Sequence, residues 1–315
     1  MSYVLAVDLG GTKCSAASID KSGRLLSRRT VAVDHSSAMG PLRQIIELGN
    51  ELADGKRPHR VFAAAAVAVP GLVRRKGTVW APNLPGWENM PLASRLKRAL
   101  GIPVLVESDR SAAVLGECWR GAGRGRSDVV VLMIGTGIGA GILSGGRIIR
   151  GAHELSGCAG WLTITREKVP KATGNGELET LVAGPAIARA AQAALREGQQ
   201  SCLSAMDGSK ITAHEVAAAA RQGDRVAQNI FDRCGKLLGF GIANIVSLFD
   251  PQVVVLGGGM ASAADLYLDA LKSAMRERAQ PLAARQVRVV VSKLGDEIIL
   301  LGCAQLAFTT RKGKR

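Results

Sequence analysis

The chain has 315 residues, which favours two domains, and 47% of its residues are hydrophobic, as expected of a globular protein. No stretch of about eighteen uncharged apolar residues occurs, and the N-terminus lacks the basic and apolar regions of a signal peptide, so we expect a cytoplasmic protein without a membrane partner. The formal net charge of +15 favours anionic ligands such as nucleotides or sugar phosphates. Because the few aromatic residues are not interleaved with the basic ones, we expect no specific nucleic-acid partner.

Cysteine and histidine do not form the patterns of a metal site. The six cysteines are scattered singly, without a CxxC pair, so we interpret them as reduced and mostly structural thiols. No two of the four histidines have the helical spacing of metal ligands.

The first predicted element is a buried strand that ends at a glycine turn. Residues 4–9 are apolar except for Asp8, and the turn Gly10-Gly11-Thr12-Lys13 follows. Backbone N–H groups in such a turn can approach a phosphate. A strand that enters a Gly-Gly turn can equally belong to an ordinary β-hairpin.

Strands and helices alternate through the rest of the first half. A meander follows the first strand, and Ser108 or Asp109 is well placed to cap a later helix. The predicted elements are strands at 14–20, 24–33, 61–69 and 103–107 and helices at 39–52, 92–100 and 108–119. The flexible, basic stretch at 121–125 is the predicted domain boundary.

The second half repeats the first. An apolar strand at 129–134 leads into Gly135-Thr136-Gly137 and a second meander, so we expect two halves of one α/β fold. A third turn, Gly257-Gly258-Gly259, follows a strand at 252–256. The other predicted elements are helices at 178–196, at 213–249 with a break near Gly223, at 261–280 and at 295–308, and a strand at 287–291.

Three glycine-rich turns, at residues 8–13, 135–141 and 257–259, thus follow apolar strands. Each offers backbone donors at the carboxyl end of a sheet, where open α/β folds bind ligands. Three such turns, two of them in duplicated meanders, are an improbable coincidence for plain hairpins. We therefore interpret them as nucleotide-binding turns.

These turns resemble those of the actin-like ATPase and sugar kinase superfamily, and specifically the ROK family (repressors, uncharacterised open reading frames, and kinases). The resemblance extends over nearly the whole chain. The other matching segments are Val69-Pro70-Gly71, Pro82-Asn83-Leu84, Glu107-Ser108-Asp109, Gly116-Glu117, Leu178-Glu179-Thr180 and Phe249-Asp250-Pro251.

The resemblance implies two actin-like ATPase (ribonuclease H-like) domains with a nucleotide cleft between them. The first would comprise residues 1–120, completed by the C-terminal helix at about 296–315, and the second residues 121–295. It also implies a glucokinase-like, ATP-dependent sugar kinase with Mg²⁺ bridging the phosphates, and it makes a homodimer plausible.

The resemblance assigns roles to the matching residues. Asp109 corresponds to the catalytic base, and Asp8 would orient water around Mg²⁺. Phosphates would contact Gly10, Gly11, Thr12, Lys13, Gly135, Thr136 and Gly137, and the adenosine would lie against Gly257, Gly258 and Gly259. From its local sequence alone, Asp109 could instead be a simple helix N-cap, and one residue can do both.

The acceptor loop departs from the family pattern. Where family kinases have Ala-Gly-Glu-x-Gly-His, this chain has residues 156–161, and residues 171–179 replace a cysteine-rich zinc segment. In family kinases this histidine and three cysteines of the segment bind a structural zinc ion. Since this chain has none of the four residues at these positions, we expect no structural zinc. The substrate-binding residues that the resemblance implies are Gly71, Asn83, Ser108, Asp109, Cys158, Trp161 and Glu179.

Two residues of this loop are open to more than one interpretation. Trp161 could stack on the apolar face of a sugar or fill the space left by the zinc segment, and we expect filling because a tryptophan side chain usually finds a core. Cys158 could be a reactive thiol, but nothing in the neighbouring sequence favours this, so we expect inert packing.

Three functions follow from the sequence. We expect an ATP:sugar phosphotransferase whose preference for a hexose or hexose derivative is altered. A non-catalytic sugar- or nucleotide-binding protein is the alternative. A repressor is the third candidate, but family repressors carry a DNA-binding domain ahead of the first glycine turn, whereas seven residues precede Asp8 here.

Overall fold

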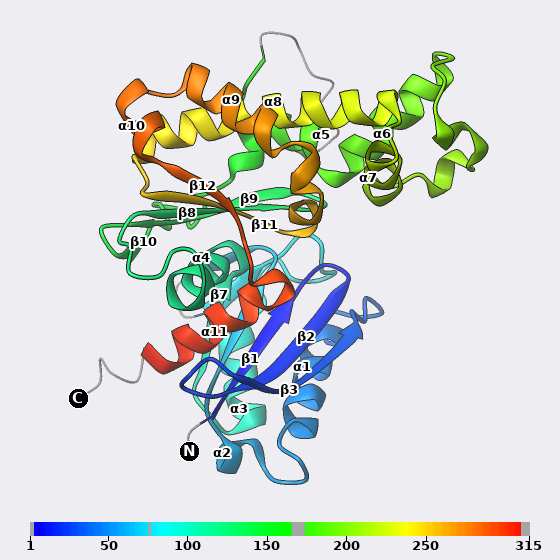
Figure 1. The fold of residues 1–315 in the computed structure, drawn as a ribbon. Coiled ribbons are helices and arrows are strands. Elements are labelled where there is room, and N and C mark those ends of the chain that lie inside the picture. The colour runs from blue at the N-terminus through cyan, green and yellow to red at the C-terminus, as the bar shows by residue number, and fades with distance from the viewer. Residues whose placement is uncertain (1–2, 75–76, 166–173, 310–315) are drawn as a thin grey trace. The chain divides into compact units, whose positions relative to one another are not determined.

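The structure is a computed structural model that describes residues 3–74, 77–165 and 174–309. It divides into two compact units, drawn in Figure 1. Unit 1 comprises Met1–Gly125, Ile148–Ser156 and Lys293–Arg315, and unit 2 comprises Arg126–Arg147 and Gly157–Ser292. The first change of unit, after Gly125, falls at the end of the predicted boundary stretch at 121–125 and five residues beyond the predicted first domain of residues 1–120. The return of Ile148–Ser156 to unit 1 was not predicted.

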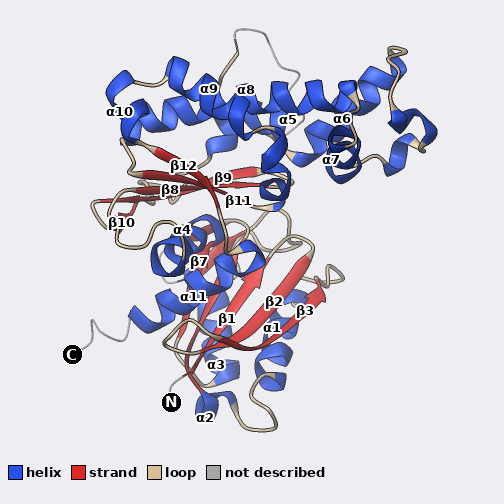
Figure 2. Ribbon diagram, in the orientation of Figure 1, coloured by secondary structure: helices blue, strands red, loops and turns tan. Residues whose placement is uncertain are grey.

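Unit 1 is built on a five-stranded sheet with the order β3-β2-β1-β4-β7 (Figure 2). β1 (Tyr3–Leu9), β2 (Lys13–Ile19) and β3 (Leu25–Ala32) form the predicted antiparallel meander. β4 (Phe62–Val69) lies parallel to β1 and to β7 (Val104–Ser108). Since β1 and β4 are buried on both faces, they appear in the sequence as continuous apolar runs.

Helices cover both faces of this sheet. α1 (Gly40–Glu51) and α3 (Leu92–Leu100) pack on one face, and α4 (Asp109–Arg120) and α11 (Ile298–Thr309) on the other. A Cβ on Gly302 would overlap the backbone of α4, so glycine lets α11 and α4 approach closely. The smaller elements of unit 1 are α2 (Pro58–Val61), β5 (Leu72–Arg74) and β6 (Thr78–Trp80).

Unit 2 repeats this strand order, as β10-β9-β8-β11-β12, which confirms the predicted duplication. β8 (Val129–Ile134) and β9 (Ile138–Ser144) are antiparallel, while β11 (Val253–Gly257) is parallel to β8 and to β12 (Arg288–Val291). β10 (Arg147–Ile148) is the short edge strand.

The helices of unit 2 lie largely on one side of its sheet (Figure 2). They are α5 (Glu177–Val182), α6 (Gly184–Arg196), α7 (Ala213–Arg221), α8 (Arg225–Phe249), α9 (Leu268–Arg278) and α10 (Pro281–Gln286). Short 3-10 segments occur at Ala159–Trp161, Cys202–Ala205, Gly208–Lys210, Gly259–Leu266 and, in unit 1, Gly295–Glu297.

Three predicted helices are wrong in extent. The helix at 178–196 is interrupted at Ala183, because Pro185 lacks an N–H group and cannot continue the preceding helix. The helix at 261–280 begins as a 3-10 segment, in which the Ser262 hydroxyl donates to the carbonyl of Gly259 and competes with helical bonding. The helix at 295–308 also begins with a 3-10 turn. In the part of the chain that is described, no helix is long and apolar enough to cross a membrane.

Candidate active site

The first glycine turn joins β1 to β2, so the hairpin interpretation describes its topology correctly. The N–H of Gly10 donates to the carbonyl of Lys13 at 2.8 Å, and a Cβ on Gly10 would lie 3.2 Å from that same oxygen. A Cβ on Gly11, by contrast, would have no heavy atom within 4 Å, and its φ is not positive. Unit 1 therefore gives no packing or conformational reason for glycine at position 11, and the open space allows a ligand to approach the backbone.

His35, which the sequence did not single out, supports this turn. Its Nε2 atom lies 2.9 Å from the carbonyl oxygen of Gly11. The N–H of Val33 donates to the carbonyl of Thr12 at 2.9 Å. The chain that follows β3 thus holds the turn from the side, a contact between residues 24 positions apart that no local sequence signal announces.

The N-cap of α4 is Ser108, which leaves the carboxylate of Asp109 outside the capping role. The Ser108 hydroxyl oxygen accepts from the N–H of Ser111 at 3.3 Å, as an N-cap side chain does. Asp109 Oδ1 accepts from the N–H of Arg110 at 2.7 Å. Of the two sequence interpretations of Asp109, the structure therefore removes the simple N-cap.

Two carboxylates of unit 1 have raised pKa values. Burial, with the nearby charge of Asp109 and a smaller effect of Asp296, raises the pKa of Asp8 to about 7, while Arg28 opposes this rise. Burial also raises the pKa of Asp109, against the lowering effects of Arg110. A carboxylate with a raised pKa is a stronger proton acceptor than an exposed aspartate, which suits general base catalysis.

Gly71 and Asn83 lie near the β5–β6 hairpin of unit 1. A Cβ on Gly71 would overlap the carbonyl oxygen of Trp80, so packing alone requires glycine there. Asn83 is exposed, in a turn where the N–H of Leu84 donates to the carbonyl of Ala81. The described contacts of these two residues are structural, and their sugar-binding role stays a prediction.

The two glycine turns of unit 2 share one edge of its sheet, because β8 and β11 are adjacent and parallel, with Gly257 opposite Met133. The N–H of Gly135 donates to the carbonyl of Gly137 at 2.9 Å, and Thr136 is exposed. Residues 138–141, predicted as part of the turn, instead begin β9.

The glycines of these turns fall into two classes. Gly135 and Gly259 would have no heavy atom within 4 Å of an added Cβ. Gly258 has a φ of 82°, and its Cβ would lie 2.5 Å from the carbonyl oxygen of Ile134, so the fold itself requires glycine. Gly135 and Gly259 thus resemble Gly11 in leaving space beside exposed backbone.

Glu179, predicted as a sugar contact, is bonded to the second glycine turn. Its Oε2 atom accepts from the N–H of Ile138 at 2.7 Å. A Cβ on Gly137 would lie 2.7 Å from Oε2, and one on Gly160 would lie 3.0 Å from the same atom. Within unit 2, Glu179 therefore connects the acceptor loop to the turn at 135–137.

The prediction that Trp161 fills the core is wrong, because 56% of its surface is exposed. The backbone packs closely at this point, since a Cβ on Gly176 would overlap Gly160 and lie 2.5 Å from the Cα of Trp161. Ala159 is the residue of this loop that packs into the core, and Cys158 is half-buried.

The zinc prediction falls partly on residues 171–173, which lie outside the described residues. Among the residues that are described, no group of three or more His, Cys, Asp or Glu side chains could hold a metal ion.

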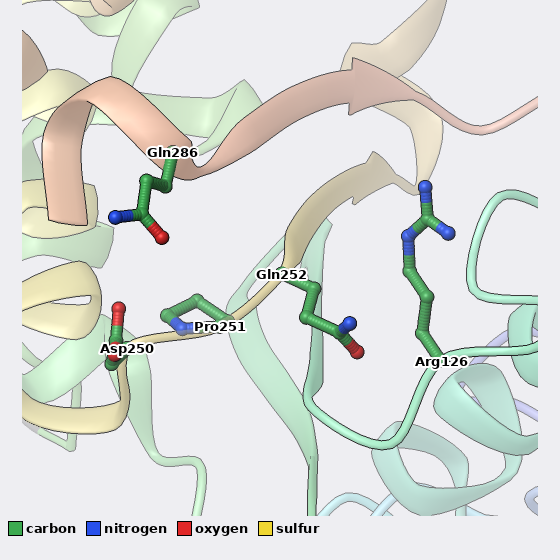
Figure 3. A pocket seen from close by; sticks show the side chains of 5 residues that line it. All are labelled: Arg126, Asp250, Pro251, Gln252 and Gln286. Atoms are coloured by element: carbon green, nitrogen blue, oxygen red, sulfur yellow. The ribbon is translucent and has the colours of Figure 1, made fainter.

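Unit 2 also carries a polar pocket of about 400 Å³ away from its glycine turns (Figure 3). Asp250 and Pro251 follow α8, and Gln252 directly precedes β11, so this pocket lies at the amino end of the strand whose carboxyl end carries residues 257–259. Figure 3 shows Arg126 at one end of the pocket and Gln286 at the other. The pocket is therefore separate from the predicted nucleotide site.

Known proteins resemble this chain over nearly its whole length. The chain is 31% identical over 310 residues to the glucokinase of Thermotoga maritima, covering 96% of each chain. The solved structure of a ROK family glucokinase from Streptomyces griseus in complex with glucose and AMPPNP matches with a TM-score of 0.83 and 31% identity, covering 98% of this chain and 100% of that one. A ROK family transcriptional regulator, a homologue of the E. coli MLC protein, matches with a TM-score of 0.89 and 25% identity, covering 99% of this chain and 79% of that one.

The family model described as "ROK family" matches residues 4–310. The two units have the two-domain actin-like ATPase fold of the ROK glucokinases, as predicted. The family contains sugar kinases and also transcriptional regulators. With its three glycine turns, its duplicated sheet order and this match over nearly its whole length, the chain belongs to the ROK family.

Proposed function

We propose that this protein is a glucokinase-like, ATP-dependent sugar kinase, and that Asp109 is its general base. The proposal rests on one observation. A Cβ added to Gly11, Gly135 or Gly259 would meet no heavy atom within 4 Å, so packing does not require glycine there and open space lies beside the backbone. Space next to backbone donors at the carboxyl ends of strands suits a bound phosphate. The relatives named glucokinase support sugar as the acceptor.

The glycine turns would hold the nucleotide. Backbone N–H groups of residues 10–13 and 135–137 would donate to phosphate oxygens, with the Lys13 side chain adding charge, and residues 257–259 would lie against the adenosine. Mg²⁺ would neutralise charge on the phosphates. Asp8 would suit a position near this ion: burial, with the neighbouring charge of Asp109, raises its pKa to about 7, and a cation would favour its charged form.

Asp109 would act on the acceptor. Its carboxylate accepts the proton of the sugar hydroxyl while the hydroxyl oxygen bonds to the γ-phosphorus and the bond from that phosphorus to the β–γ bridging oxygen breaks, releasing ADP. Phosphoryl transfer depends mainly on positioning and charge stabilisation, so holding both substrates in line is the main task of the fold.

The acceptor side supports an altered sugar preference. The exposed Trp161 favours stacking on the apolar face of a sugar over filling of the core. Gly71, Asn83, Ser108, Cys158 and Glu179 are proposed to lie around the same sugar. Cys158 and Trp161 stand where the family pattern Ala-Gly-Glu-x-Gly-His has its glutamate and its histidine, and they cannot make the same hydrogen bonds. We therefore propose a hexose or hexose derivative other than glucose as the preferred acceptor.

ADP release tests the proposal. The purified protein is assayed with Mg²⁺ and ATP against hexoses, amino sugars, N-acylated sugars and polyols, and we expect ADP above background with at least one of them. Asp109→Asn should lower kcat about 10²- to 10⁴-fold, the usual contribution of a general base. No ADP with any acceptor would refute the proposal.

A non-catalytic binding protein is the second candidate, which the match to a ROK family transcriptional regulator supports. Calorimetric binding of a sugar without turnover, unchanged by Asp109→Asn, would favour it. A cytoplasmic location and a homodimer stay predictions.

A further inference from the structure

The segment Ile148–Ser156 returns to unit 1 although the residues on both sides of it belong to unit 2. Arg150 is its anchor. Its Nη2 atom lies 2.5 Å from Oε2 of Glu107, at the end of β7. Glu107 is 6% exposed, and a buried carboxylate needs a charged or hydrogen-bonding partner, so this pair joins two segments 43 residues apart.

The same carboxylate also contacts the backbone beside the proposed base. Glu107 Oε1 accepts from the N–H of Ser108 at 3.0 Å. Ser108 is the N-cap of α4, and Asp109 is the first residue of that helix. A continuous chain of contacts therefore runs from Arg150 through Glu107 to the N–H of Ser108, the residue that precedes Asp109.

Arg150 also closes the loop that it begins. Its carbonyl accepts from the N–H of Ser156 at 3.0 Å, and its Nε lies 4.0 Å from the carboxylate of Glu154. Gly151 and Glu154 have positive φ values of 77° and 61°, which turn the chain sharply inside the loop. The position of Arg150 thus sets where the chain enters Gly157 and Cys158, the proposed acceptor loop.

We propose that Arg150 is a positioning residue for the acceptor: through Glu107 it fixes the segment Ile148–Ser156 against the strand end that carries Asp109. Among the described residues, the guanidinium of Arg150 pairs with Glu107 and Glu154, and Glu107 links it to Ser108 beside the base. Its effect should therefore fall on the placement of the sugar and not on the binding of ATP. This inference rests on the proposed kinase function.

Four variants test it. Arg150→Met removes the charge, Arg150→Lys keeps the charge but loses the planar fork, and Glu107→Leu combined with Arg150→Met replaces the pair by apolar side chains. Arg24→Met is the matched control, because Arg24 forms an exposed ion pair with Asp20, at 3.6 Å, in the same unit.

We expect Arg150→Met to lower kcat/KM for the sugar at least tenfold while KM for ATP changes less than twofold. Arg150→Lys should lie between this variant and the wild type, and Arg24→Met should equal the wild type. The double variant should regain thermal stability, since no charge stays buried without a partner, but should not regain kcat/KM for the sugar. If the double variant regained both thermal stability and kcat/KM for the sugar, the pair would be merely structural and the proposal would fail. A rise in KM for ATP in Arg150→Met as large as the loss of kcat/KM for the sugar would also overturn it.

Hydrogen exchange separates this inference from the proposed function. In the protein without ligands, Arg150→Met should speed amide exchange at Ser156 and Ser108 at least tenfold, whereas Arg24→Met should not. Unchanged exchange at both sites would refute the positioning role even in an active kinase. If the wild type phosphorylates no sugar, the kinase proposal fails while the exchange result still decides whether Arg150 fixes the loop.

Discussion

Gly11→Ala should separate stability from nucleotide binding. An alanine Cβ at position 11 meets no heavy atom within 4 Å, and its φ is not in the left-handed region, so the folded state accepts it without strain. The free energy of unfolding should change by less than about 0.5 kcal/mol, or rise by up to about 1 kcal/mol because alanine restricts the unfolded chain. The new methyl group would instead stand in the space that a phosphate needs.

ATP affinity should therefore fall. Losing one backbone hydrogen bond to a charged phosphate costs about 1.5–3 kcal/mol, which corresponds to a dissociation constant roughly 10- to 150-fold higher. Calorimetric titration with Mg²⁺ and ATP measures the affinity, and chemical denaturation measures the stability. Unchanged ATP affinity in Gly11→Ala would refute the assignment of this turn to phosphate.

Gly258→Ala is the matched contrast. With a φ of 82° and a Cβ only 2.5 Å from the carbonyl oxygen of Ile134, this variant should lose at least about 2 kcal/mol of stability, from the left-handed conformation and from the overlap together. Equal stability of Gly11→Ala and Gly258→Ala would contradict the division of these glycines into two classes.

Three further predictions concern side chains. The pKa of Asp8 is about 7 in the folded protein and 3.8 in the unfolded chain, so between pH 4 and pH 7 the folded protein holds a proton that the unfolded chain has released. The free energy of unfolding should therefore fall by up to about 4 kcal/mol as the pH rises from 4 to 7. Asp8→Asn should flatten this pH dependence in denaturation measured across the same range. Glu179→Ala should raise KM for both ATP and sugar, because it frees the N–H of Ile138 and opens the acceptor loop, and steady-state kinetics that show a change for only one substrate would contradict this. Trp161→Ala should change the melting temperature little, given an exposure of 56%, but should weaken sugar binding, whereas a large loss of stability without a binding effect would restore a core role.

Much of the fold could be predicted from local patterns. Apolar runs that end in glycine indicated β1, β8 and β11, and the repetition of a meander after two of these strands indicated the duplicated sheet. These signals are local. A strand that is buried on both faces must be apolar along its length, and a turn whose backbone a ligand approaches needs glycine, which has no side chain. The ROK resemblance rested on the same turns.

The tertiary structure decided how side chains are used. Ser108, and not Asp109, caps α4, because the competition between two adjacent cap candidates depends on backbone geometry. Trp161 is exposed, and Glu179 bonds to Ile138, 41 residues away. These outcomes depend on contacts between distant segments, which periodicity and spacing do not encode.

The sequence by itself determined the two repeated α/β units, the three glycine turns and the presence of an aspartate at the start of α4, since each follows from residue type and order. Only the tertiary structure separated the glycines that the fold requires from those that leave room for a ligand. It also raised the pKa of Asp8, through burial and the charge of Asp109, and paired Arg150 with Glu107. The physical reason is that burial and charge coupling depend on which segments become neighbours in the folded chain.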